Sequence, residues 1–101
     1  MAGDEKAIEA GGRVRAHVRV TGSVQGVFFR SGVRSQAKLL EIRGWVRNVP
    51  DSSLEAVFEG DRDRVRKMID FCWEGPPGAQ VRKVEVEWEK PRHDTPGFEI
   101  K

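Results

Sequence analysis

Between residues 13 and 40 the hydrophobic pattern changes once, from a period of two to the spacing of a helix. From Arg13 to Val20, valine and alanine alternate strictly with basic residues, which is the pattern of a half-buried strand. After that strand, hydrophobic residues recur as on one face of a helix, at Phe29, Val33, Ala37 and Leu40. The chain is therefore predicted to run from strand to loop to helix, with the loop ending near Phe29.

The predicted loop contains Gly22 and Gly26. Glycine adopts backbone angles that are closed to other residues and leaves no side chain between the backbone and a ligand. The first N–H groups of a helix have no partner within the helix and are free to bind an anion beside such a loop. The segment from Gly22 to Arg30 therefore predicts a backbone cradle for an anion of the size of phosphate.

The remaining sequence predicts four more strands and a second helix. The strands are expected at Ile42 to Val49, at Leu54 to Glu59, around the alternating Val84, Val86 and Trp88, and at Phe98 to Ile100. Turn residues at 51–53 predict a hairpin between the second and third strands. The second helix is expected to begin after Asp61, to present Val65, Met68, Ile69 and Cys72 on one face, and to stop at Gly75-Pro76-Pro77-Gly78. Val81 is out of phase with the fourth strand, which indicates a bulge or a late start.

This order of elements predicts an α+β, ferredoxin-like fold, a split βαβ sandwich with an antiparallel-rich sheet and two helices on one face. A right-handed crossover makes the first and second strands parallel, so their C-terminal ends lie at the same edge of the sheet. Asn48 closes the second strand. We therefore expect its side-chain amide to lie near the glycine loop and Arg30.

One domain is expected from a chain of 101 residues, formed by residues 13–101. Residues 1–12 have no useful periodicity and are predicted to be a flexible N-terminal tail. No hydrophobic run has transmembrane length, and the chain as given shows no secretory signal. The single cysteine, Cys72, is expected to be a buried structural thiol. These features favour a cytoplasmic protein without membrane contact.

The charges are nearly balanced, since 18 basic and 16 acidic residues give a net charge of +2 and the two signs are interleaved. This balance does not favour a nucleic-acid partner. Arg13, Arg15 and Arg19 form a basic row on the outer face of the first strand, where cross-strand ion pairs on a solvated sheet face are expected. The acidic residues available for these pairs are Glu55, Glu59, Glu85 and Glu87. The charged outer face favours a monomer.

Arg30 falls in the first turn of the first helix, where the helix dipole does not favour a cation. A bound phosphate would explain it, because a guanidinium group can bind two phosphate oxygens while backbone amides bind the others. Asn48 can orient a water molecule but cannot remove its proton. The substrate would then have to be intrinsically reactive, and a mixed carboxylic-phosphoric anhydride fits because its leaving carboxylate is good.

Two segments, Gly22 to Arg30 and Gly44 to Asn48, closely resemble the signature motifs of the acylphosphatase family. The resemblance covers Arg13 to Lys101 and includes the Gly75 to Ala79 turn and the closing Phe98 to Ile100. It implies a ferredoxin-like fold and hydrolysis of acyl phosphates to a carboxylate and inorganic phosphate, without metal, cofactor or phosphoenzyme. Inorganic phosphate would then be both a product and a competitive inhibitor.

By position, the resemblance assigns Arg30 to binding the substrate phosphate and Asn48 to orienting the attacking water. It places the phosphate cradle at the backbone of Ser23, Val24, Gln25, Gly26, Val27, Phe28, Phe29 and Arg30. Glu41 and Ser52 stand where the family commonly has glycine. If the backbone keeps left-handed angles there, each should cost about 1 kcal/mol of stability, and we expect an effect on stability or turn geometry rather than on catalysis.

Several other interpretations are less favoured by the residues. An RNA-binding module would need the aromatic run around Phe28 on a central strand, whereas this run leads into a helix. A catalytically silent domain, or one that acts on carbamoyl phosphate within a larger machine, remains an alternative. A metal site is not expected, because His17 and His93 are far apart and no ligand cluster surrounds either. The aromatic residues expected in the core rather than as substrate stackers are Phe28, Phe29, Trp45, Trp73 and Trp88. Gln25 could bond either to loop backbone or to substrate.

Overall fold

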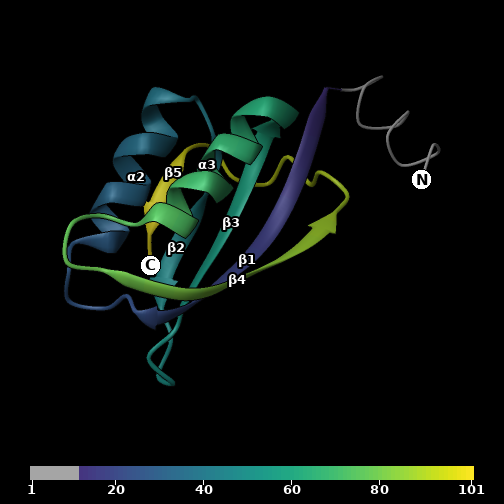
Figure 1. Cartoon of the computed structure of the whole chain (residues 1–101). Coiled ribbons are helices and arrows are strands. Elements are labelled where there is room, and N and C mark those ends of the chain that lie inside the picture. The colour runs from purple at the N-terminus through teal and green to yellow at the C-terminus, as the bar shows by residue number, and fades with distance from the viewer. Residues whose placement is uncertain (1–11) are drawn as a thin grey trace.

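The computed structural model describes residues 12–101, so all of the predicted N-terminal tail except Gly12 lies outside the described residues. Within this range a five-stranded sheet is covered on one face by two helices (Figure 1). The strands are β1 (Arg13–Ser23), β2 (Arg43–Asn48), β3 (Leu54–Asp61), β4 (Gln80–Glu89) and β5 (Phe98–Ile100), and the helices are α2 (Phe29–Leu39) and α3 (Arg62–Glu74). None of the described helices is long and apolar enough to cross a lipid bilayer.

The sheet has the strand order β4-β1-β3-β2-β5. Neighbouring strands are antiparallel except β2 and β5, which are parallel, so the sheet is mixed. Because β1 and β2 are both antiparallel to β3, they run in the same direction and end at the same edge. The predicted fold is confirmed.

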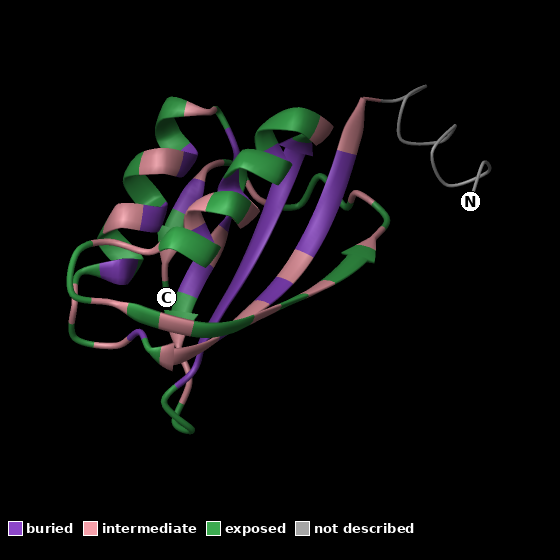
Figure 2. Ribbon diagram, viewed as in Figure 1, coloured by how far each residue is buried: buried purple, intermediate pink, exposed green. Residues whose placement is uncertain are grey.

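The alternation predicted for β1 places its hydrophobic side chains between the sheet and the helices. Val14, Ala16, Val18 and Val20 are at most 3% exposed. They pack in one core with Phe29, Val33 and Ala37 of α2 and with Val65, Met68 and Cys72 of α3. In Figure 2 the buried residues lie along the central strands of the sheet and on short stretches of the two helices.

The two expected departures from glycine do occur at left-handed positions. Glu41 has φ 55° and follows the C-terminus of α2, where its N–H donates to the carbonyl of Lys38 and that of Ile42 donates to Ala37. This is the Schellman arrangement that usually uses glycine. Ser52 has φ 77° in the β2–β3 hairpin. Both residues thus hold the backbone that a glycine would favour.

The predicted bulge in the fourth strand is also confirmed. Thr21 of β1 pairs with Lys83, but the next residue, Gly22, pairs with Val81, so Arg82 is the extra residue of β4. A Cβ atom on Gly22 would lie 2.1 Å from the carbonyl oxygen of Gln80. The close approach of β4 therefore requires glycine at position 22.

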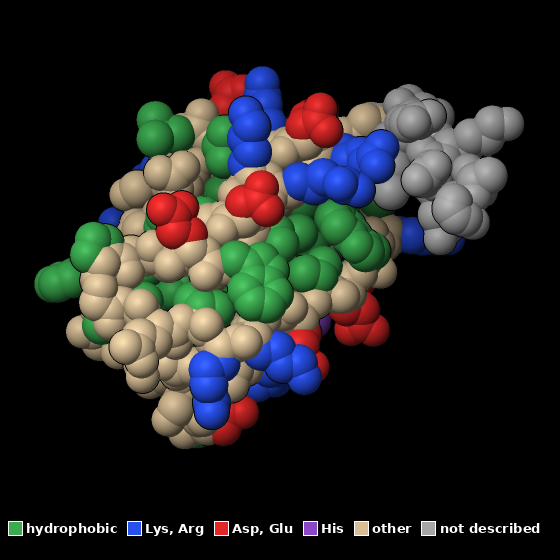
Figure 3. Space-filling view, viewed as in Figure 1, with side chains coloured by type: hydrophobic (Ala, Val, Ile, Leu, Met, Phe, Trp, Pro, Cys, Tyr) green, Lys and Arg blue, Asp and Glu red, His purple; other side chains and the backbone are tan. Residues whose placement is uncertain are grey.

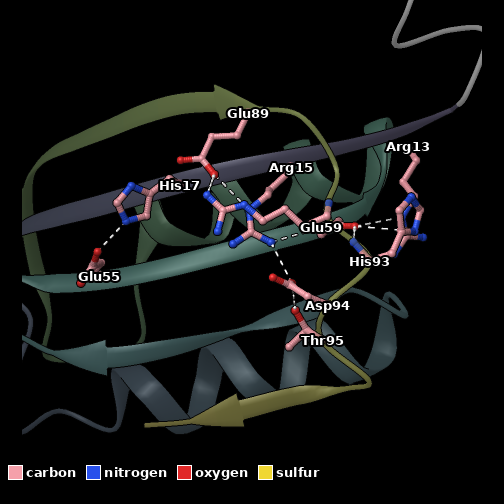
Figure 4. Close-up of polar contacts among 10 residues, drawn as sticks. Arg13, Arg15, His17, Glu55, Glu59, Glu89, His93, Asp94 and Thr95 are labelled. Carbon is pink, nitrogen blue, oxygen red and sulfur yellow. Dashed lines mark hydrogen bonds and ion pairs between the residues drawn. The ribbon is translucent and has the colours of Figure 1, made fainter.

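The prediction of a solvated outer sheet face is wrong for its central ion pair. Arg15 and Glu59 are 5% and 1% exposed, with Arg15 Nη1 3.0 Å from Glu59 Oε1. The segment after β4 covers them, because the backbone N–H groups of Arg92 and His93 donate to Glu59 at 3.1 and 2.9 Å (Figure 4). These groups and two arginines outweigh the effect of burial, which alone would raise the pKa of Glu59, and lower it to about 2.

The core assignment of the aromatic residues is correct for Phe29, which is 1% exposed, but wrong for Phe28, Trp73 and Trp88. Their exposed fractions are 84%, 51% and 47%. Trp88 lies on β4, which is an edge strand and so is covered from one side only. Figure 3 shows hydrophobic side chains at the surface where α3 adjoins β4. Alternation predicts which face of a strand is apolar, but not how far the helices extend over that face.

Candidate active site

The segment from Val24 to Phe28 leaves the end of β1 and enters α2 through two left-handed residues. Gly26 has φ 76° and Phe28 has φ 61°. Phe28 is the N-cap residue of α2, but its side chain makes no capping bond, and its carbonyl accepts the N–H of Gly32 at 3.0 Å. Alternating left-handed and right-handed residues turn successive N–H groups towards one side, which forms an anion-binding nest. A bulky residue such as Phe28 adopts this conformation only where its surroundings impose it.

The amides of this loop are available to a ligand. Within residues 12–101, no backbone N–H from Gln25 to Ser31 donates to a backbone carbonyl or to a side chain. The first turn of α2 contains no acidic residue and no side-chain cap that would occupy these donors. The partial positive charge of the helix N-terminus is therefore uncompensated and favours an anion at this place.

Arg30 and Asn48 face one cavity of about 300 Å³ beside this loop. The residues that line it are Val24, Gly26, Phe28, Phe29, Arg30, Ser31, Asn48 and Ile100. Arg30 is exposed, and its guanidinium group makes no hydrogen bond or ion pair with any described residue. This differs from the usual surface arginine with a carboxylate partner and leaves all five N–H donors free.

Asn48, which lines the same cavity, carries an unpaired polar atom. Its Oδ1 atom is buried and has no hydrogen-bond partner among the described residues. Leaving a buried acceptor unpaired costs about 1–3 kcal/mol, so such atoms are uncommon and need an explanation. A water molecule or a substrate group held between Asn48 and Arg30 would supply the missing partner.

The side chain of Gln25 bonds to backbone, but to that of the β2–β3 hairpin and not to that of the loop. Its Nε2 atom donates to the carbonyls of Val49 and Ser53, both at 2.9 Å, and so ties the loop to the β2–β3 hairpin. These two bonds hold the hairpin beside the loop at Val49, which follows Asn48, and at Ser53, which precedes β3. Gln25 therefore contacts protein backbone and fixes the distance between the two halves of the cavity.

Six of the residues predicted for the site line the cavity, namely Val24, Gly26, Phe28, Phe29, Arg30 and Asn48. Ser23, Gln25 and Val27 do not line it. Sequence reasoning missed Ser31 and Ile100. Ile100 reaches the cavity because β5 pairs in parallel with β2, with Ile100 opposite Val46. The sequence did predict the short strand that contains Ile100, but three residues are too few to predict which strand it pairs with.

The cavity offers anion binding but no acid–base chemistry of its own. None of its lining residues carries a carboxylate, imidazole or thiol group. A larger cavity of about 700 Å³ lies at the opposite end of the strands, near the start of β2. Two of its arginines are engaged there, since Arg64 pairs with Glu41 at 2.8 Å and Arg13 with Glu59 at 3.2 Å. The carboxylates of Glu41 and Asp61 also line this larger cavity and disfavour an anion there, so the smaller cavity is the better candidate site.

Comparison with known proteins agrees with this geometry. The acylphosphatase family profile matches residues 16–100. A curated acylphosphatase from Pelotomaculum thermopropionicum is 52% identical over 88 residues, which cover 87% of this chain and 96% of that protein. The chain belongs to the acylphosphatase family.

Solved structures extend the comparison to three dimensions. An acylphosphatase from Coxiella burnetii superposes with a TM-score of 0.85 at 38% identity, covering 91% of this chain and 96% of that one. A structure of full-length HypF in a phosphate- and nucleotide-bound form matches with a TM-score of 0.80 at 26% identity. That match covers 88% of this chain but only 12% of HypF. The acylphosphatase fold thus occurs both in proteins of about this length and within a much longer chain.

Proposed function

We propose that this acylphosphatase hydrolyses the carboxyl-phosphate bond of acyl phosphates in the 300 Å³ cavity, with Arg30 and the loop amides binding the phosphoryl group and Asn48 orienting the attacking water. The observation that carries the assignment is the pairing, in one cavity, of an arginine without a partner and a buried amide oxygen without a partner. Both groups lack hydrogen bonds that a phosphate and a water would provide.

The phosphoryl oxygens are the negative groups that need stabilisation. The guanidinium fork of Arg30 can take two of them, and the N–H groups at the start of α2 can take the third. These donors neutralise charge and fix the phosphorus atom in place, which is most of what phosphoryl transfer asks of a protein. The acyl group then points out of the cavity, where Phe28 and Ile100 offer only apolar contact. Broad tolerance for the acyl group is expected.

The attacking water is placed by Asn48. Its amide oxygen accepts a hydrogen bond from the water, which turns a lone pair of the water towards phosphorus. As the water oxygen bonds to phosphorus, the bond to the carboxylate oxygen breaks, and the water proton passes to a phosphoryl oxygen of the substrate. This route needs no protein base, which fits a cavity without carboxylate or imidazole.

The products are a carboxylate and inorganic phosphate, and phosphate should compete with substrate for the same donors. The protein should act as a monomer in the cytoplasm and need no cofactor and no metal for hydrolysis. A free, fully buried Cys72 suits a reducing compartment.

The test is hydrolysis of benzoyl phosphate by the purified full-length protein in EDTA, followed by absorbance. Arg30→Ala should raise KM and lower kcat, because it removes binding in both ground and transition states. Asn48→Ala should lower kcat by roughly 10²-fold with little change in KM, by analogy with the loss of a transition-state donor. Arg34→Ala is the matched control, since Arg34 is an exposed arginine one turn further along α2 that does not line the cavity.

Inorganic phosphate should inhibit the wild-type protein competitively and the Arg30→Ala variant much less. Turnover that is unchanged in Asn48→Ala, or a loss in Arg34→Ala as large as that in Arg30→Ala, would contradict the roles assigned here. A folded wild-type protein that binds phosphate without turnover would instead identify a silent phosphate-binding domain.

A further inference from the structure

We propose that His17, Glu87 and Glu89 form a binding site for a divalent transition-metal ion, best matched by zinc, on the sheet face opposite the helices. One ligand atom from each of the three side chains lies within 4.8 Å of the other two. None of them lines the catalytic cavity. The inference therefore stands apart from the proposed hydrolysis.

The strand register creates this cluster. His17 of β1 lies directly opposite Glu87 of β4, and Glu89, two residues further along β4, lies opposite Arg15. Residues two apart on a strand share a face, so the imidazole and both carboxylates are on the same side of the sheet. The sequence did not predict a metal site, because the two histidines are far apart. The two carboxylates lie 70 or more positions from His17 in the sequence, and only the pairing of β1 with β4 brings them together.

The contact of His17 with Glu55 leaves its other ring nitrogen available to a metal. Its Nε2 atom lies 2.5 Å from Glu55 Oε2, and Glu55 is itself held by Arg47. A carboxylate that accepts from one ring nitrogen keeps the proton there and leaves the lone pair on the other, Nδ1. Figure 4 shows Glu55 and Glu89 on opposite sides of the His17 ring. This is the carboxylate–histidine–metal arrangement that orients ligating imidazoles and strengthens their binding.

The two carboxylates have oxygens to spare. Glu89 contacts Arg15 at 3.0 Å and Arg92 at 3.7 Å, but both contacts use Oε1, so Oε2 is free. Glu87 is exposed, and its carboxylate makes no hydrogen bond or ion pair with any described residue. Rotation of the exposed Glu87 side chain can bring the three ligand atoms close enough to one ion for the 2.0–2.2 Å bonds that are typical of zinc.

The donor set selects the class of ion. One imidazole nitrogen with two carboxylate oxygens suits zinc and its neighbours in the first transition series, whereas calcium and magnesium prefer oxygen alone. The His17 side chain is 34% exposed and that of Glu89 is 28% exposed. An ion can therefore enter from solvent and complete its coordination with water.

Binding is tested on the full-length protein after chelator treatment and dialysis, by calorimetric titration with zinc chloride. One zinc ion per chain is expected for the wild type. Glu87→Gln and His17→Gln should each weaken binding by at least tenfold, and Glu55→Gln by roughly 10–100-fold, as for other residues that orient a ligating histidine. Glu87→Gln changes an exposed side chain, so the test does not depend on whether His17→Gln folds.

Two controls distinguish this cluster from general surface binding. Glu85→Gln removes another exposed carboxylate from the same strand and face, and His93→Gln removes the other histidine; both should bind zinc as the wild type does. Cobalt(II) gives an independent readout, because its visible absorption reports nitrogen and oxygen ligation, and this spectrum should be lost in Glu87→Gln. Absence of stoichiometric zinc binding to the wild type would overturn the proposal. So would binding that persists in both Glu87→Gln and His17→Gln, or that His93→Gln weakens equally.

Discussion

Replacement of Glu59 by glutamine should destabilise the protein strongly. Glu59 is 1% exposed and binds Arg13 at 3.2 Å and Arg15 at 3.0 Å. It also accepts the backbone N–H groups of Arg92 and His93, which fixes the segment after β4 against the sheet. Glu59→Gln keeps the size of the side chain but leaves two arginines beside a neutral group.

The size of the effect follows from the pKa of Glu59. Burial alone would raise this pKa, but the backbone and arginine hydrogen bonds lower it from 4.5 to about 2. A difference of this size corresponds to about 3 kcal/mol of folding free energy, at 1.36 kcal/mol for each pKa unit. Because the folded-state pKa is depressed, this contribution is fully present above pH 4.5 and is lost as the pH falls through about 2. By pH 3 about half of it should be gone.

The assay is urea unfolding of the wild type and Glu59→Gln at pH 7 and at pH 3. The difference in unfolding free energy should be about 3 kcal/mol at pH 7 and about half of that at pH 3. Glu55 and Asp51 also have lowered pKa values, but they are present in both proteins and cancel in this difference. Glu85→Gln, at an exposed carboxylate, is the control and should change stability by less than about 0.5 kcal/mol. A Glu59→Gln protein as stable as the wild type at pH 7, or an equal deficit at both pH values, would refute the reasoning.

Three further outcomes are expected. Ser52→Gly should raise the unfolding free energy by about 1 kcal/mol, because glycine has no penalty at φ 77°; a thermal melt that shifts down would contradict this. Gln25→Ala should lower kcat for benzoyl phosphate by about tenfold while the protein stays folded by circular dichroism, since the hairpin carrying Asn48 loses two bonds to the loop. Native Cys72 should resist thiol reagents at pH 8, because burial raises its pKa to about 12; labelling faster than global unfolding would show that the helix opens locally.

The sequence was sufficient to predict the fold and the meeting of Arg30 with Asn48. Alternation and helical spacing predict the elements, and the rule for right-handed crossovers then brings the ends of β1 and β2 to one edge. The sequence was not sufficient to predict the burial of a side chain where a distant segment covers it or leaves it uncovered. The burial of Arg15 depends on the segment after β4, and the exposure of Trp88 depends on β4 being an edge strand. The contribution of Ile100 depends on a parallel pairing of only three residues.

Ser52, which stands where the family commonly has glycine, should affect stability and not catalysis, because other contacts hold the active-site geometry. Ser52 is left-handed, yet the hairpin keeps the hydrogen bonds from Ser52 N–H to the Val49 carbonyl and from Val49 N–H to the Ser53 carbonyl. Gln25 independently binds the same two carbonyls, those of Val49 and Ser53. The position of Asn48 is thus determined by hydrogen bonds that do not involve the Ser52 side chain. The strain at Ser52 should therefore appear in the free energy of unfolding and not in turnover, so that Ser52→Gly is expected to stabilise the protein with kcat and KM unchanged.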